Sequence, residues 1–408
     1  MTPDCSSESF VAGVFRDEYG KCVSTLTRLL GDITLAEEAV ADAFVVALER
    51  WDPDAPPPNP GGWIMTTARR RAIDRLRREA TREARHAEAL LPAEPDESTR
   101  EVGPVRDDRL RMLFTCCHPA LAAESQVALT LRLLGGLDTT EIARAFLVPE
   151  ATLAQRIVRA KRKIRDANIP YRVPADADLP GRLGAVLAVV YLVYTSGHVA
   201  VGSQLSRGDL CSEAVRLARL LVELMPDEPE ALGLLALLLL SESRRGTRVD
   251  SAGRLVLLPD QDRCRWNRAL IAEGHELVRA CLRRGAPGPY QFQAAINAVH
   301  SDAARAQDTD WTQILALYDQ WLAVAPTPVV AVNRAVALAQ IASPEIALAE
   351  LEGLELSDYQ PYWVARAELL TRARRTAEAD ECFGRALQLT ENDLEHAHLT
   401  GRRAALAL

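Results

Sequence analysis

Two stretches of basic residues carry the most recognisable chemistry in this sequence of 408 residues. Between Arg69 and Arg85 there are eight arginines against three acids, and between Arg156 and Arg165 there are six basic residues and no acid. Side chains of this kind suit contacts with nucleic-acid phosphates, and guanidinium planes also stack on exposed bases. Two solvated helix faces are the alternative explanation. The formal charge of -8 argues against a surface that coats nucleic acid everywhere.

Residues for catalysis or metal binding form no recognisable constellation. His198, His275 and His300 fall on predicted helices with no nucleophile arrangement or metal spacing beside them. The eight cysteines show no CxxC spacing. Adjacent Cys116 and Cys117 on a helix would point about 100° apart, which favours buried cysteines over metal ligands. We therefore expect no enzyme, no metal and no cofactor. The absence of a secretory signal predicts a reduced, cytoplasmic setting.

The composition predicts an all-α protein of two to four domains. Ala and Leu dominate, aromatic residues make up 5% of the chain, and Val and Ile are too scattered to mark out a parallel sheet. The apolar runs at 183–194 and 231–240 fall short of the roughly 20 residues that cross a bilayer, so we expect core helices and no membrane partner.

Breaks rich in proline and acidic residues divide the chain. The first helical module is interrupted at 52–60, where five prolines forbid helix. The segment after it is rich in Pro, Glu, Asp and Ser, which is typical of a flexible linker. The resulting parts are a first module at 8–85, a linker at 86–106, a second module at 107–167, a linker at 168–180 and a long helical part at 181–408.

In the first module, Thr34 and Glu37 have the spacing of a capping box, which predicts a helix from there to about Arg50. Its expected buried stripe consists of Val40, Phe44, Ala47 and Leu48. The acids Glu37, Glu38 and Asp42 then lie on the outer face, which suits either a partner or plain solvent.

A second helix is predicted to begin at Trp63, after the proline loop. Its expected buried residues are Ile64, Ala68, Ala72, Ile73 and Leu76. The remaining surface carries Arg69, Arg70, Arg71, Arg75, Arg77 and Arg78. Trp51 and Trp63 flank the loop, and either base stacking or ordinary packing explains them.

The second module contains the pattern of a helix-turn-helix. A short helix begins near Thr140, a turn of three or four residues follows, and the next helix buries Leu153, Ile157 and Ala160. The exposed side chains of that helix are Thr152, Gln155, Arg156, Arg159, Lys161, Arg162 and Lys163. Residues near the helix start can read base edges, and those towards its end can hold phosphates.

These residues resemble a known family. The run 35–44, the Trp- and Pro-rich loop and the arginine helix at 63–78 resemble region 2 of extracytoplasmic-function (ECF) sigma factors. The helix-turn-helix at 140–163 resembles their region 4, in the same order. Leu147 and Ala154 depart from the family pattern in and after the turn, so the promoter sequence stays open.

The resemblance implies three sets of binding residues. The residues expected to bind core RNA polymerase are Glu37, Glu38, Asp42 and Phe44. Capture of the melted -10 strand falls to Trp51, Asn59, Trp63, Arg69, Arg70, Arg71, Arg75, Arg77 and Arg78. Contact with the double-stranded -35 element falls to Thr152, Gln155, Arg156, Arg159, Lys161, Arg162 and Lys163.

The C-terminal part reads as an α-solenoid of helix pairs. Amphipathic Ala- and Leu-rich segments end at the polar or proline breaks near 226, 326 and 391, and small residues stand where helices would cross. It resembles the tetratricopeptide-like extension of one sigma factor subgroup. That resemblance implies a modulator of sigma activity and a possible protein or peptide partner.

Two other classes of protein fit parts of the sequence. An ordinary helix-turn-helix regulator with a ligand-sensing repeat domain would have no use for the acidic helix, the proline loop and the arginine helix of the first module. An enzyme with a DNA-binding appendage lacks a catalytic constellation. The sequence therefore favours a sigma factor.

Overall fold

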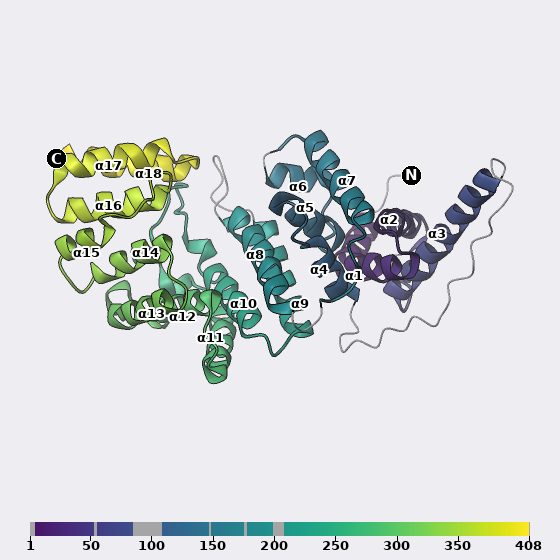
Figure 1. Ribbon diagram of the computed structural model, residues 1–408, viewed down its shortest axis with the longest axis horizontal. Helices are drawn as coiled ribbons and strands as arrows, with labels where there is room; N and C mark the ends of the chain where they lie inside the picture. The colour runs from purple at the N-terminus through teal and green to yellow at the C-terminus, as the bar shows by residue number, and fades with distance from the viewer. Residues whose placement is uncertain are drawn as a thin grey trace. The chain divides into compact units, whose positions relative to one another are not determined.

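The computed structural model describes residues 5–52, 55–84, 108–146, 148–174, 178–198 and 208–407. Over these ranges the protein is helical, with two isolated β-bridges in place of a sheet, which confirms the all-α prediction (Figure 1). The chain divides into two compact units, Met1–Val190 and Tyr191–Leu408, each described by itself below. Within the described ranges, every helix is too short or too polar to span a membrane.

Three helices form the first module of the N-terminal unit: α1 (Cys5–Leu30), α2 (Ile33–Arg50) and α3 (Pro60–Ala84). Each packs against the other two. Fully buried side chains from all three meet in one core: Tyr19, Val23, Leu26, Val40, Phe44, Ile64, Ala68 and Ala72. Gly31, with a φ of 73°, makes the left-handed turn that ends α1 and lets α2 fold back.

Local details of α2 and α3 differ from the sequence prediction. Asp32, and not Thr34, caps α2, because its carboxylate accepts from the backbone N–H groups of Thr34 and Leu35. Helix α3 begins at Pro60, three residues before the predicted start, where a proline has no amide to lose. The sequence predicts that Leu48 and Leu76 are buried. This prediction is wrong, because the two side chains are 49% and 43% exposed.

The second module consists of α4 (Asp108–Cys116), α5 (Ala123–Leu133), α6 (Thr139–Ala145) and α7 (Glu150–Asp166). A reciprocal capping box begins α6, in which Asp138 and Glu141 each accept from the other's backbone N–H at 2.7 Å. Helices α6 and α7 pack together through the predicted residues Leu153, Ile157 and Ala160, which are buried. The predicted helix-turn-helix is confirmed; Leu147, in its turn, lies outside the described residues.

The segment after α7 is fixed to both modules. Ile169 is buried, and the Tyr171 hydroxyl donates to the carbonyl oxygens of Ser24 at 2.8 Å and Asp108 at 3.1 Å. The first part of the predicted linker at 168–180 is therefore packed structure. The predicted linker at 86–106 lies outside the described residues. Helix α8 (Leu179–His198) follows and contains the boundary between the units.

The C-terminal unit continues with ten helices among its described residues. They are α9 (Gly208–Leu224), α10 (Pro229–Glu242), α11 (Arg268–Arg284), α12 (Pro289–Asp302), α13 (Trp311–Val324), α14 (Pro328–Leu338), α15 (Pro344–Leu351), α16 (Gln360–Arg372), α17 (Thr376–Gln388) and α18 (Asp393–Ala404). Helix α10 is apolar around its circumference because α9, α11 and α12 all pack on it. Short 3-10 turns η1 (Arg245–Thr247), η2 (Leu258–Asp260) and η3 (Arg263–Arg265) connect α10 to α11.

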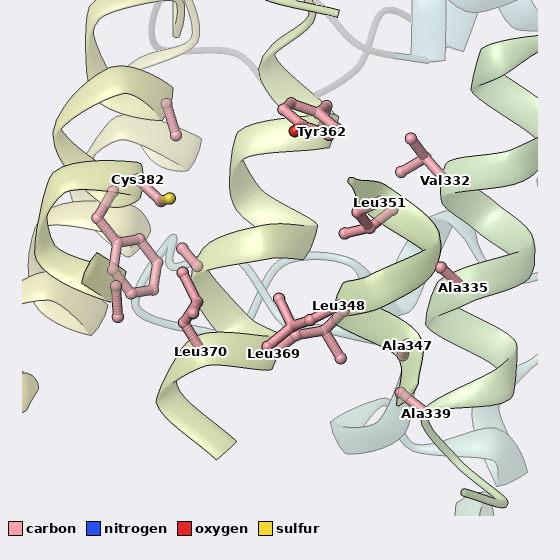
Figure 2. Close-up of a cluster of buried hydrophobic side chains, with 14 of the residues drawn as sticks. Val332, Ala335, Ala339, Ala347, Leu348, Leu351, Tyr362, Leu369, Leu370 and Cys382 are labelled. Carbon is pink, nitrogen blue, oxygen red and sulfur yellow. The ribbon is translucent and has the colours of Figure 1, made fainter. Parts of the chain in front are cut away.

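Helices α14 to α18 share one hydrophobic core (Figure 2). Ala335, Ala339 and Ala347 are buried at the contact of α14 and α15, where small side chains allow close approach. Three residues join α16 to α17, so these two helices form an antiparallel pair closed by Phe383 and Cys382. Consecutive helices thus pack as neighbours along this part of the chain.

Candidate polymerase and nucleic-acid interface

The arginine face of α3 lies on the surface. Arg69, Arg70, Arg71, Arg75, Arg77 and Arg78 are all exposed, as the sequence predicts. Two of them reach α2, where Arg71 lies 3.6 Å from Asp42 and Arg75 lies 2.5 Å from Glu38. Exposed ion pairs contribute about 0–1 kcal/mol, so phosphate can replace these carboxylates at little cost.

The proline loop begins and ends with packed aromatic rings. Trp51 is 8% exposed, and its ring lies 5.3 Å from that of Trp63 and 6.0 Å from that of Phe10. Packing therefore explains Trp51, whereas Trp63 is only half-buried. Asn59 is exposed and accepts from the Gly62 amide at 2.9 Å, so it holds the first turn of α3 in place.

The outer face of α2 combines acidic and apolar side chains. Glu38 and Asp42 are exposed there, and one and two turns further on are Val45, 53% exposed, and Leu48, 49% exposed. We name Glu38, Asp42, Val45 and Leu48 the α2 outer face. Sequence reasoning missed Val45, although its helical spacing from Glu38 and Asp42 was a usable signal.

Phe44 lies inside the module. Its ring packs edge-on against Phe15 at 4.8 Å and lies 6.3 Å from the ring of Tyr19. At 4% exposure it offers no surface to a partner in this conformation. Its contribution here is to hold α2 against α1.

Glu37 is buried between the two modules, and its predicted place on the outer face is wrong. Its carboxylate accepts from Nε of Arg132 on α5 at 2.6 Å and from Nζ of Lys161 on α7. Arg132 also donates to the Leu137 carbonyl at 3.1 Å. Burial and then Glu37 raise the pKa of the neighbouring Tyr19 hydroxyl, so that group stays neutral. We name Glu37, Arg132 and Lys161 the Glu37 triad.

Helix α1 also contacts the second module directly. A Cβ at Gly20 would stand 2.7 Å from the Leu134 carbonyl oxygen, so only glycine permits this approach. Nearby, Nε of Arg28 donates to Asp108 at 2.9 Å. The two modules are therefore packed against each other within the N-terminal unit.

Most of the predicted DNA-reading side chains of α7 are accessible. Thr152, Gln155, Arg159, Arg162 and Lys163 are exposed and Arg156 is half-buried. Lys161 differs, because its side chain is 14% exposed and bonded to Glu37. Release of the Glu37 triad would add this cation to the exposed face.

The adjacent cysteines Cys116 and Cys117 are predicted to be core residues and not metal ligands. Cys116 and Cys117 are fully buried, and the Cys117 sulfur lies 3.6 Å from the Thr130 hydroxyl. Their predicted role as small core side chains is confirmed. The described ranges contain no group of three His, Cys, Asp or Glu side chains arranged for a metal.

Comparisons with known families match separate models to the first module, to the second module and to residues after them. Residues 14–82 match the model for sigma-70 region 2, and residues 111–164 match the model for sigma-70 region 4. Residues 182–282 match DUF6596, described as a family of unknown function. No solved structure matches the chain.

Individual relatives extend over different lengths. The uncharacterized protein R00370 of Rhizobium meliloti is 43% identical over 388 residues, covering 93% of this chain and 92% of that protein. The probable ECF RNA polymerase sigma factor SigI of Mycobacterium tuberculosis is 26% identical over 39% of this chain and 56% of its own length. ECF RNA polymerase sigma factor SigK of Mycobacterium ulcerans is 28% identical over 35% of this chain and 76% of its own.

The N-terminal unit therefore contains sigma-70 regions 2 and 4, and part of the chain is similar to the ECF sigma factors SigI and SigK. Over nearly its full length the chain belongs to the same family as the rhizobial protein R00370. The matches to SigI and SigK extend over less than two fifths of this chain, and DUF6596 gives no function to residues 182–282.

Proposed function

We propose that this protein binds core RNA polymerase through the α2 outer face and directs transcription from promoters read by α3 and α7. The observation that carries the proposal is that two exposed basic helices occupy the positions of sigma-70 regions 2 and 4. In this proposal Trp63, Asn59 and the α3 arginines hold the melted -10 strand. Thr152, Gln155 and the basic residues of α7 contact the -35 element.

Promoter binding requires the two regions to separate. The -10 and -35 elements lie about 25 base pairs apart, which is about 85 Å at 3.4 Å per base pair. Helix α3 has 25 residues and α7 has 17, which correspond to lengths of about 38 and 26 Å. Because Glu37 on α2 bonds directly to Lys161 on α7, the packed arrangement cannot reach both elements. The Glu37 triad therefore has to open when the protein binds polymerase and promoter.

Opening also gives Glu37 a second role. Once released from Arg132 and Lys161, it lies on α2 one residue before Glu38 and becomes available to polymerase. Phe44 serves polymerase binding indirectly, because it sets the position of α2 from within the core.

The test is co-elution of the full-length protein with core RNA polymerase. Val45→Asp places a charge at the centre of the α2 outer face and should abolish co-elution, whereas Leu282→Asp, at a side chain 69% exposed on α11, should leave it unchanged. Phe44→Ala is unsuitable as an interface variant, since removal of a buried phenylalanine costs about 3–5 kcal/mol of stability and would confound a loss of binding.

Glu37→Gln belongs in the same experiment, because a stable triad would itself oppose binding. Failure of wild type and Glu37→Gln to co-elute, with specific DNA binding retained, would reject the sigma proposal. A helix-turn-helix regulator would then be the better account.

For the C-terminal unit we infer a tetratricopeptide-like solenoid that modulates sigma activity by binding a cytoplasmic protein or peptide. The consecutive packing of α14 to α18 supports this inference, as does a cavity of about 760 Å³ whose lining includes Leu257, Asn333 and Val364. Val364→Asp in this cavity should alter the yield of initiation in a reconstituted assay without changing co-elution. An unchanged yield in the presence of cell extract would argue against the cavity as the modulating site.

A further inference from the structure

A group of basic side chains in the C-terminal unit lacks the acids that normally accompany it. Tyr194 and His198 project from the same face of α8, with stacked rings 5.2 Å apart. Arg244 and Arg248 flank η1, Arg263 lies on η3, and His300 lies near the end of α12. We name Tyr194, His198, Arg244, Arg248, Arg263 and His300 the arginine cluster.

Arg244 is the central member of the arginine cluster. Its charge acts on Tyr194, His198 and His300, and it is repelled by Arg248 and Arg263. It is half-buried, and its side chain forms neither a hydrogen bond nor an ion pair within the described part of the chain. A guanidinium group that has lost part of its contact with water normally has a hydrogen-bond partner.

The other two guanidinium groups are anchored but retain free donors. Arg248 donates from Nη1 to the His198 carbonyl at 2.6 Å. Arg263 donates from Nη1 to the carbonyls of His300 and Ala303 at the C-terminal end of α12, and its guanidinium lies 4.8 Å from the centre of the Trp266 ring. Trp266 in turn donates to the Thr247 hydroxyl at 3.1 Å, which ties η3 to η1.

Four buried polar atoms of the arginine cluster have no partner in the part of the chain that the structure describes. They are the Tyr194 hydroxyl, Nδ1 of His198, Nε of Arg263 and Nδ1 of His300. Tyr194 is 3% exposed and Arg263 is 6% exposed, so water does not satisfy these groups freely. Burial and the nearby arginines lower the pKa of His198 to about 3 and that of His300 to about 4. Both imidazoles are therefore neutral at pH 7, and each can donate one N–H.

The carboxylates around the arginine cluster are committed elsewhere or lie at its edge. Glu242, which acts on Tyr194, pairs through Oε1 with Arg245 at 2.9 Å, and its Oε2 is buried without a partner among the described residues. Asp308, which acts on Arg263, pairs with Arg305 at 2.9 Å. Glu395 acts on Arg248 without a direct ion pair in the described part of the chain. Three guanidinium groups thus face at most one uncommitted negative charge.

We propose that the arginine cluster is a binding site for a small phosphate-class oxyanion, either free phosphate or the phosphate group of a small metabolite. A phosphate dianion balances the excess positive charge, which a single carboxylate would leave largely uncompensated. Its oxygens accept several hydrogen bonds at once, and planar guanidinium groups suit that geometry. Arg244 and Arg248 are partly exposed, so the arginine cluster is in contact with solvent.

The test is calorimetric titration of the full-length protein with inorganic phosphate, with glycerol 3-phosphate and, as a control, with sodium acetate at the same ionic strength. Binding of inorganic phosphate identifies the free ion as sufficient. Binding of glycerol 3-phosphate alone identifies a phosphate borne by a larger molecule. Either result, with acetate inactive, supports the proposal; no binding of either phosphate compound would overturn it.

Three variants locate the site. Arg244→Gln should weaken phosphate binding about a hundredfold and Tyr194→Phe about tenfold, because each removes donors to a charged ligand. Arg265→Gln changes an exposed arginine of the same 3-10 turn as Arg263 and should bind as wild type does. Tyr194→Phe removes a hydroxyl that has no partner among the described residues, so it should fold normally even if Arg244→Gln does not. Wild-type affinity in Tyr194→Phe and in folded Arg244→Gln would place phosphate elsewhere and reject the site.

Discussion

The Glu37 triad and the arginine cluster differ in whether their buried charges are paired. In the N-terminal unit one carboxylate, 6% exposed, accepts from two cations that come from different helices. In the C-terminal unit three arginines meet with several unpartnered donors and no dedicated acid among the described residues. Both groups use long cationic side chains, but only the first is internally balanced.

The difference bears on what each group can do. A balanced triad stabilises one arrangement of two modules, and it must be broken before they part. An unbalanced cluster opposes its own packing and gains stability when an anion arrives. The first therefore resists a conformational change, whereas the second favours binding.

The largest expected loss of stability comes from removal of a cation from the Glu37 triad. Arg132→Met deprives Glu37 of its 2.6 Å partner and should destabilise the N-terminal unit by about 3 kcal/mol. Urea denaturation followed by circular dichroism measures the loss. Arg70→Met, at an exposed arginine of α3, is the control and should change stability by less than about 0.5 kcal/mol. Equal effects of both variants would show that the triad is not a stabilising contact.

Glu37→Gln should have a smaller effect on stability, about 2 kcal/mol, because the amide still offers an oxygen to one cation. Its main consequence is a looser contact between regions 2 and 4. Fluorophores on cysteines at positions 29 and 158, both exposed, should show lower energy transfer, with Cys5 and Cys264 changed to serine to avoid labelling. Glu124→Gln, at an exposed acid of α5, is the control. Unchanged transfer in Glu37→Gln would mean that other contacts hold the modules together.

Low pH should destabilise the C-terminal unit, because the histidines of the arginine cluster are neutral in the folded protein and become protonated on unfolding. The folded pKa of His300, about 4, lies below the unfolded value of about 6.5, so its stabilising contribution is complete above pH 6.5 and is lost as pH falls towards 4. At pH 5 the loss is about 2 kcal/mol. His300→Gln should therefore give a shallower decline of stability between pH 6.5 and 5 than wild type gives. An identical decline would show that folding does not lower the pKa of His300.

The smallest effect, and the one of opposite sign, concerns Arg244. In phosphate-free buffer Arg244→Met should leave stability unchanged or raise it by about 1 kcal/mol, since an uncompensated charge is replaced by an apolar side chain. Thermal unfolding checks the sign. A loss comparable to that of Arg132→Met would mean that Arg244 has a stabilising partner and that the two groups are alike.

Local patterns made the N-terminal modules predictable. The helix-turn-helix follows from the spacing of Leu153, Ile157 and Ala160, and the α3 arginines are exposed because the apolar stripe is on the other face. Glu37 was not predictable in this way, because Arg132 is 95 residues further along the chain. Leu48 was not predictable for a similar reason, since the helical sequence pattern does not distinguish an apolar side chain in a core from one on a docking face.

The C-terminal unit was predictable as helices but not as a site. Small residues such as Ala335 and Ala347 do mark helix contacts. The arginine cluster gathers residues from α8, η1, η3 and α12 that are more than 100 positions apart in the case of Tyr194 and His300. No spacing rule brings these residues together, because their proximity depends on how α10 packs against its neighbours.

The hydroxyl of Tyr171, which donates to Ser24 in one module and to Asp108 in the other, determines where this protein can be shortened. A chain that ends at residue 170 loses both bonds, and it also loses the Arg182 donor to the Phe114 carbonyl at 2.6 Å. Transcription by such a fragment would report a damaged pair of sigma regions as well as a missing C-terminal unit. Cutting after Val190, where the compact unit ends, keeps those bonds and isolates the contribution of the remaining residues.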